Sequence, residues 1–72
     1  MFKSLIKELR EGAGLSQYAL AKEIRVSQSA VAKWELGKTE PTASALISLS
    51  KYFKVSADYL LGLEDEFGNK KY

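Results

Sequence analysis

Residues 17–35, QYALAKEIRVSQSAVAKWE, hold two short helical patterns separated by a tight turn. In the second pattern Val31 and Trp34 lie three residues apart, so at ~100° per residue both side chains point to one side of a helix. Because the connection between the patterns is very short, the two helices are expected to cross at a steep angle. The side chains expected to be buried between them are Leu20, Ala21, Val26 and Val31.

The second of these helices keeps one face free of large apolar groups. The residues on that face are Gln28, Ser29, Ala32 and Lys33. An amide, a hydroxyl, a methyl and an ammonium group on an exposed helix are suited to reading base edges in the DNA major groove. The alternative is a solvated surface, because most polar helix faces have no other role. The small Ala21 is also common at any helical corner, so the two helices alone leave both interpretations open.

Length and composition limit the other classes of protein. A chain of 72 residues forms one small domain with a compact core. It has no Cys and no His, so disulfides, thiolate metal sites and the usual general base are excluded, and we expect neither an enzyme nor a cofactor. Its apolar runs are far shorter than the ~18 residues that span a bilayer, so no membrane contact and a cytoplasmic location are expected.

Charge is distributed unevenly along the chain. Residues 1–54 hold nine Lys or Arg against five acids, whereas residues 55–72 hold two against four. The basic part is therefore the part that contains the candidate reading helix.

The whole chain predicts five helices and no strand. The apolar positions at helical spacing outside residues 17–35 are Phe2, Leu5, Ile6, Leu9, Leu46, Leu49, Phe53, Tyr59, Leu60 and Leu61. The expected N-caps are Ser16, Ser27, either Thr42 or Ser44 after Pro41, and Ser56. Helix ends are expected near Gly12, Gly14, Gly37 and Gly62.

These positions together resemble the phage-repressor-like helix-turn-helix family, of the Cro and cI type, also called XRE. The residues that carry the resemblance are Leu15, Ser16, Gln17, Leu20, Ala21, Ile24, Val26, Ser27, Gln28, Val31, Trp34, Glu35, Gly37 and Pro41, and downstream Leu46, Leu49, Phe53, Val55, Ser56, Asp58, Tyr59, Leu60, Leu61 and Gly62. The resemblance covers about residues 2–63. It implies an all-α, lambda-repressor-like DNA-binding domain at residues 1–63, with helices two and three as the helix-turn-helix. Residues 64–72 form a tail that is a candidate for disorder.

The resemblance also implies roles for individual residues. Base reading falls to Gln28, Ser29, Ala32 and Lys33, with Ala32 able to contact a thymine methyl. DNA phosphate contacts fall to Ser16, Gln17, Lys38 and Thr39, although Gln17 could also be an ordinary first-turn residue. The structural residues are Arg10, Ala21, Val31, Trp34 and Glu35. Arg10 and Glu35 match a pair that links helix one to the end of the recognition helix, and the alternative is two solvated charges.

One residue departs from the family pattern. Arg25 lies in the turn where relatives commonly carry glycine, because the backbone there tends toward the left-handed region. A residue with a Cβ loses roughly 1–2 kcal/mol if it keeps that conformation. Either the turn is strained or it has a different shape.

The expected function is that of a sequence-specific double-stranded DNA-binding regulator. The resemblance implies a repressor that binds a palindromic operator through the major groove as a homodimer, with a protein antagonist as a further possible partner. Candidate dimer contacts are Leu61, Leu63 and Phe67, for which the alternative is packing on helix one. The alternative function is an antitoxin-like or anti-repressor module that binds protein with the same fold.

Overall fold

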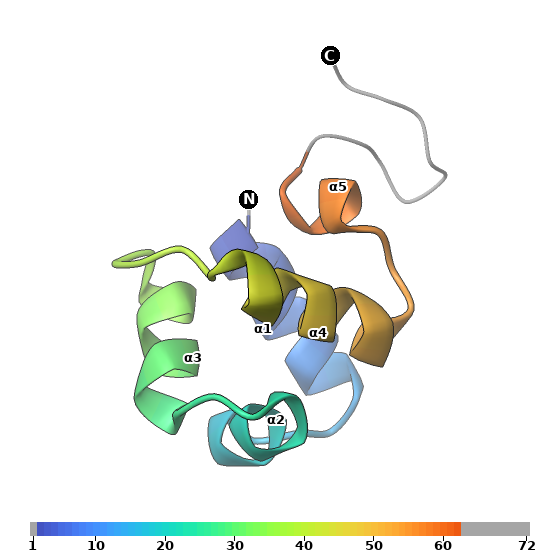
Figure 1. The fold of residues 1–72 in the computed structure, drawn as a ribbon. Coiled ribbons are helices and arrows are strands. Elements are labelled where there is room, and N and C mark those ends of the chain that lie inside the picture. Colours follow the sequence, from blue (N-terminus) through green and yellow to red (C-terminus); the bar gives the residue numbers. More distant parts are fainter. Residues whose placement is uncertain (1, 63–72) are drawn as a thin grey trace.

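The computed structural model describes the backbone of residues 2–62 and the side chains of residues 5–62. Over this part of the chain the regular secondary structure consists of helices joined by turns and loops, with no strand, as predicted (Figure 1). The helices are α1 (Phe2–Gly12), α2 (Gln17–Ile24), α3 (Gln28–Leu36), α4 (Ala43–Phe53) and α5 (Ala57–Leu60). Leu61 lies one residue beyond α5, not inside it as expected, and acts as its C-cap. None of the helices in residues 2–62 is long and apolar enough to cross a membrane.

Four hydroxyl residues set where α2 to α5 begin. Each has an extended backbone, and its side-chain oxygen accepts a hydrogen bond from the backbone N–H three residues ahead. These N-caps are Ser16, Ser27, Thr42 and Ser56. Such a bond satisfies one of the donors that a helix leaves free in its first turn. Between the two residues considered for α4, Thr42 is the cap, and Ser44 lies inside the helix.

The core draws one fully buried large side chain from each helix. These residues are Ile6, Leu20, Val31, Leu49 and Leu60. Trp34 is also in the core with only 4% of its surface exposed, as the sequence predicted. Val26, which we expected to be buried, is only partly buried at the edge of this core, because it lies in the turn and not on a helix face.

The arrangement leaves one helix at the edge of the molecule. α3 packs against α1 and α2. In Figure 1 it stands at the left of the view, with α2 below it and α4 to its right, and no other described helix lies on its outer side. The outward side of α3 is therefore not covered by any other described helix and faces the solvent.

Candidate nucleic-acid interface

The two sides of α3 differ in burial. Val31 is fully buried and Trp34 nearly so, whereas Gln28, Ser29 and Lys33 are exposed. The structure thus brings these three predicted base-reading side chains onto one solvent-facing surface. Ala32 belongs to the same surface but is partly buried. Since the apolar side is fixed in the core, the polar side is presented in a defined orientation.

The turn between α2 and α3 is built around a left-handed residue. Arg25 has φ 62° and ψ 46°, and its N–H donates to the carbonyl of Ala21. The N–H of Val26 donates to the same carbonyl at 2.9 Å. Ala21 is 2% exposed. The backbone therefore keeps the conformation for which glycine is best suited, although Arg25 occupies the position.

Arg25→Gly is expected to raise the free energy of unfolding by about 0.5–1 kcal/mol. The substitution relieves ~1–2 kcal/mol of left-handed strain but gives the unfolded chain ~0.5–1 kcal/mol of extra entropy. Lys54, which ends α4 at φ 57° and ψ 44°, is a matched site, and Lys54→Gly is expected to stabilise by a similar amount. Urea melts of both variants test this. A loss of stability at Arg25 alone would show that its side chain makes a specific interaction.

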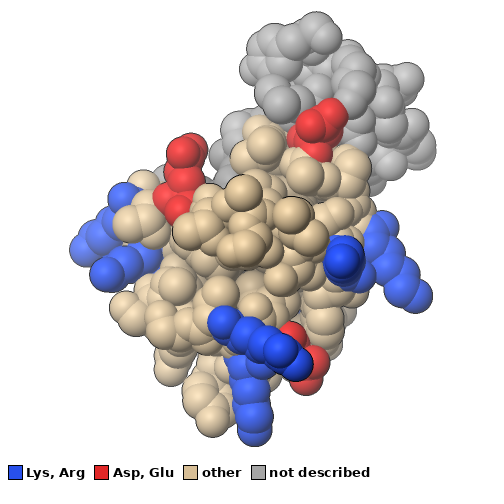
Figure 2. All heavy atoms as spheres, in the orientation of Figure 1, with Lys and Arg blue, Asp and Glu red and all other residues tan. Residues whose placement is uncertain are grey.

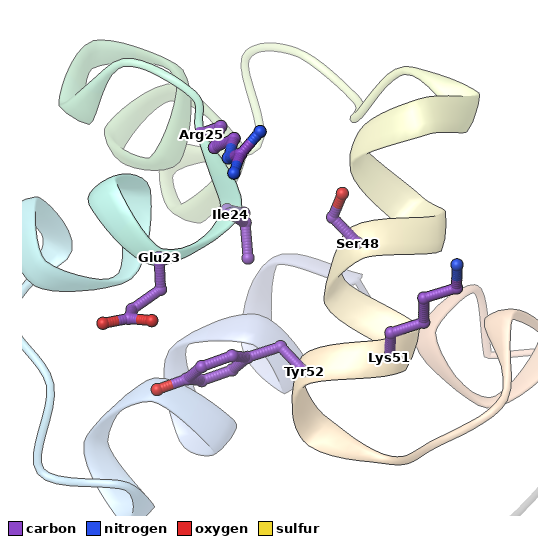
Figure 3. Close-up of a pocket in the computed structure, with 6 residues that line it drawn as sticks. All are labelled: Glu23, Ile24, Arg25, Ser48, Lys51 and Tyr52. Atoms are coloured by element: carbon purple, nitrogen blue, oxygen red, sulfur yellow. The ribbon is translucent and has the colours of Figure 1, made fainter.

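The side chain of Arg25 borders a groove between the end of α2 and α4. The groove has a volume of about 620 Å³ and is lined by Glu23, Ile24, Arg25, Ser48, Lys51 and Tyr52 (Figure 3). Within residues 5–62, neither Arg25 nor Lys51 has an ion-pair partner. An ion pair within these residues therefore does not explain why an arginine occupies this left-handed turn position.

The N-terminus of α2 carries two predicted phosphate contacts. The Ser16 hydroxyl oxygen accepts from the N–H of Ala19 at 3.0 Å, which leaves its O–H free to donate. Gln17 is half-buried, and its Nε2 donates to Oε1 of Glu35 at 3.1 Å. This bond was missed from the sequence, because no local spacing rule relates residues 18 positions apart.

Arg10 and Glu35 join α1 to the last turn of α3. Arg10 Nε donates to Oε2 of Glu35 at 2.6 Å, and Nη2 donates to Oε1 at 3.0 Å. Arg10 Nη1 also donates to the carbonyl of Leu15 at 2.8 Å. The exposed fractions of the Arg10 and Glu35 side chains are 12% and 6%, so these are not two solvated charges. The bidentate pair fixes the position of α3 relative to α1 and the loop before α2.

The pair shifts the pKa of both groups. Burial acts to raise the pKa of Glu35, but hydrogen bonds from Arg10 and Gln17 and the charges of Arg10 and Lys7 outweigh burial and lower it. The hydrogen bond to Glu35 raises the pKa of Arg10, partly offset by desolvation.

Acid is therefore expected to weaken the fold through Glu35. A carboxyl with a lowered folded pKa contributes stability that is present above its unfolded value, here 4.5, and is lost as pH falls through the folded pKa. The raised pKa of Arg10 leaves its contribution unchanged in this range, because that contribution is fully present at any pH below the ordinary, strongly basic pKa of arginine. Thermal melts between neutral pH and pH ~3 should show stability falling below about 4.5, with a smaller fall in Glu35→Gln. Identical acid slopes would exclude Glu35 as a source.

Two further predicted phosphate contacts follow α3. Gly37, at φ 76°, ends the helix, and the N–H of Lys38 donates to the carbonyl of Lys33 at 2.9 Å. Lys38 and Thr39 are both exposed in the loop beyond. Figure 2 shows Lys and Arg side chains at the left, right and lower edges of the molecule, around a broad uncharged surface. The loop thus continues the exposed surface of α3 with another cation and hydroxyl.

The fold and this surface define a class of domain: five helices in which α2 and α3 form a helix-turn-helix whose second helix is exposed along a polar side. A model of the family described as "Helix-turn-helix" matches residues 6–60. The chain belongs to this family, and specifically to its phage-repressor (XRE) type.

Two relatives illustrate the similarity of the chain to transcriptional regulators. HTH-type transcriptional activator BcrR of Enterococcus faecalis is 41% identical over 64 residues, which are 89% of this chain and 31% of BcrR. Repressor protein C2 of Salmonella phage P22 is 41% identical over 56 residues, which are 78% of this chain and 26% of C2. The chain thus spans less than a third of the length of either relative. Both relatives are named as regulators of transcription and not as enzymes.

Solved structures agree with the sequence relationship. The crystal structure of the P22 c2 repressor with synthetic operator 9T superposes with a TM-score of 0.79 at 37% identity, covering 83% of this chain and 91% of that one. A transcriptional regulator from Listeria innocua superposes with a TM-score of 0.83 at 32% identity, covering 92% of this chain and 62% of that one. The lambda-repressor-like fold expected from the sequence is therefore confirmed.

Proposed function

We propose that this chain is a sequence-specific double-stranded DNA-binding regulator of transcription that acts as a repressor. The observation that carries the proposal is the exposed surface of Gln28, Ser29 and Lys33 on a helix whose other side is buried. Support comes from the P22 c2 repressor, which has the same fold and was solved in complex with a synthetic operator. Occupation of promoter DNA by the domain would itself block transcription.

In this proposal α3 enters the major groove. The Gln28 amide and the Lys33 ammonium then hydrogen-bond to base edges, Ser29 contributes a hydroxyl, and Ala32 packs on a thymine methyl. Ser16, Gln17, Lys38 and Thr39 contact phosphates on either side of the groove. The free N–H groups in the first turn of α2 and the positive end of its helix dipole favour binding of the phosphate that Ser16 and Gln17 would contact. Phosphate contacts would set the register, and the base contacts would supply specificity.

We further propose that the chain binds a palindromic operator as a homodimer. One recognition helix covers only a few base pairs, so two of them one DNA turn apart increase both affinity and specificity. Leu61 is 43% exposed, so packing on α1 does not cover it fully, and it is the candidate contact within the described residues. The other two candidates, Leu63 and Phe67, lie outside the described residues, as does the expected tail at residues 64–72.

Leu61→Asp is expected to convert the dimer to a monomer in sedimentation velocity, because a charge cannot be buried at a symmetric apolar contact without a partner. Ile47→Asp is the matched control, since Ile47 is 54% exposed on α4 and should tolerate the change. An unchanged dimer in Leu61→Asp rules out this contact.

The proposed function is tested by selecting binding sites from random duplex DNA. A repressor of this kind should enrich one palindromic sequence, and its affinity should fall steeply with salt because Lys and other donors displace phosphate counterions. The absence of any enriched sequence, together with a flat salt response, would contradict the proposal and favour a protein-binding module.

A further inference from the structure

The Glu35 carboxylate accepts hydrogen bonds from two different parts of the fold. Its Oε1 receives Arg10 Nη2 at 3.0 Å and Gln17 Nε2 at 3.1 Å, while its Oε2 receives Arg10 Nε at 2.6 Å. Gln17 is the first residue of α2, and Glu35 lies in the last turn of α3. One carboxylate therefore connects the start of one helix of the motif to the end of the other.

This contact determines which way the Gln17 amide faces. An ionised carboxylate only accepts hydrogen bonds, so the Nε2 group of Gln17 must point toward Glu35, and the carbonyl oxygen must point elsewhere. An Nε2 group has two N–H bonds, and the bond to Glu35 uses one. The second N–H is held in a defined direction at the N-terminus of α2.

We propose that Glu35 is a positioning residue for Gln17, which it holds ready to donate to a DNA phosphate. The proposal rests on the proposed function, because it concerns the same phosphate contact. Glutamine has a flexible side chain, and fixing it in the free protein removes part of the entropy that would otherwise be lost on binding. Arg10 serves the same arrangement indirectly, since it neutralises and orients the carboxylate that holds Gln17.

The test separates this role from the structural role of the ion pair. Arg10→Met combined with Glu35→Leu replaces the pair with apolar groups of similar volume, a change that folded proteins often tolerate. Arg10→Met combined with Glu35→Gln also lacks the ion pair but keeps a carbonyl oxygen that can accept from Gln17. Melting curves identify conditions in which both chains are folded, and binding to the selected duplex is measured there with and without Gln17→Ala.

We expect Gln17→Ala to weaken binding about tenfold in the wild-type chain and severalfold beside Glu35→Gln, but less than twofold beside Glu35→Leu. Equal penalties in all three backgrounds would overturn the positioning role. So would a negligible effect of Gln17→Ala in the wild-type chain. If Gln28→Ala with Lys33→Ala still reduces binding to that of a scrambled duplex, the proposed function stands and only this inference fails.

NMR gives an independent test that needs no variant. The Gln17 side-chain NH₂ should have a clearly higher ¹⁵N order parameter than the exposed Gln28 side chain in the free protein. Equal mobility of the two groups would overturn the proposal whatever the variants show.

Discussion

A chain with Gln28→Ala and Lys33→Ala is expected to bind the selected operator at least ~30-fold more weakly, because a good base contact contributes about 1–3 kcal/mol and two are removed. Both residues are exposed, so the free energy of unfolding should change by no more than about 0.5 kcal/mol. Fluorescence anisotropy with the selected duplex and with a scrambled duplex measures the effect. Specific binding should approach the affinity for scrambled DNA.

The matched control removes the same charge from another helix. Ser48→Ala with Lys51→Ala changes the surface of α4 and takes away one ammonium group, as Lys33→Ala does. This control variant should weaken binding to the selected and the scrambled duplex by a similar factor, and that factor should be much smaller than the loss caused by the α3 substitutions. An equal loss in the two double variants would indicate attraction by net charge alone. Undiminished operator binding after the α3 substitutions would contradict base reading by this helix.

Arg10→Met is expected to lower the free energy of unfolding by about 3 kcal/mol. The substitution leaves the Glu35 carboxylate, only 6% exposed, without its cation and two of its hydrogen bonds. Breaking one side of a buried pair costs ~3–5 kcal/mol, and we take the lower end because the arginine retains some contact with water. For a domain of this size the melting temperature should fall by roughly 12–24 °C.

Lys22→Met is the control for this prediction, because Lys22 lies exposed on α2 and its charge is not among those that act on Glu35. It should shift the unfolding free energy by less than about 0.5 kcal/mol. Adding Glu35→Leu to Arg10→Met should restore much of the loss, since the unpaired charge is then removed. A single Arg10→Met chain as stable as the control would show that the pair contributes little to folding.

Local sequence patterns were sufficient to predict the helices. Three N-caps were predicted singly, and the fourth as either Thr42 or Ser44, because a hydroxyl residue before an apolar-periodic segment satisfies free N–H groups within its own turn. Val31 and Trp34 were predicted to be core residues because their spacing points both side chains toward the same side of the helix. For Arg25 the family pattern left two alternatives, a strained left-handed turn or a turn of different shape, and the structure has the left-handed backbone. The positive φ of Lys54 was not predicted, because no glycine marks that position.

The sequence by itself determined the five helices, the buried side of α3 and the polar surface opposite it, because these depend on residues within one or two turns of each other. The family resemblance implied the pair of Arg10 and Glu35, but only the tertiary structure decided that the pair is buried and that Gln17 joins it. These residues come from three helices, and the 3.1 Å bond between Gln17 and Glu35 spans 18 positions of the chain. Such a contact exists only once packing of the core has fixed the helices against one another.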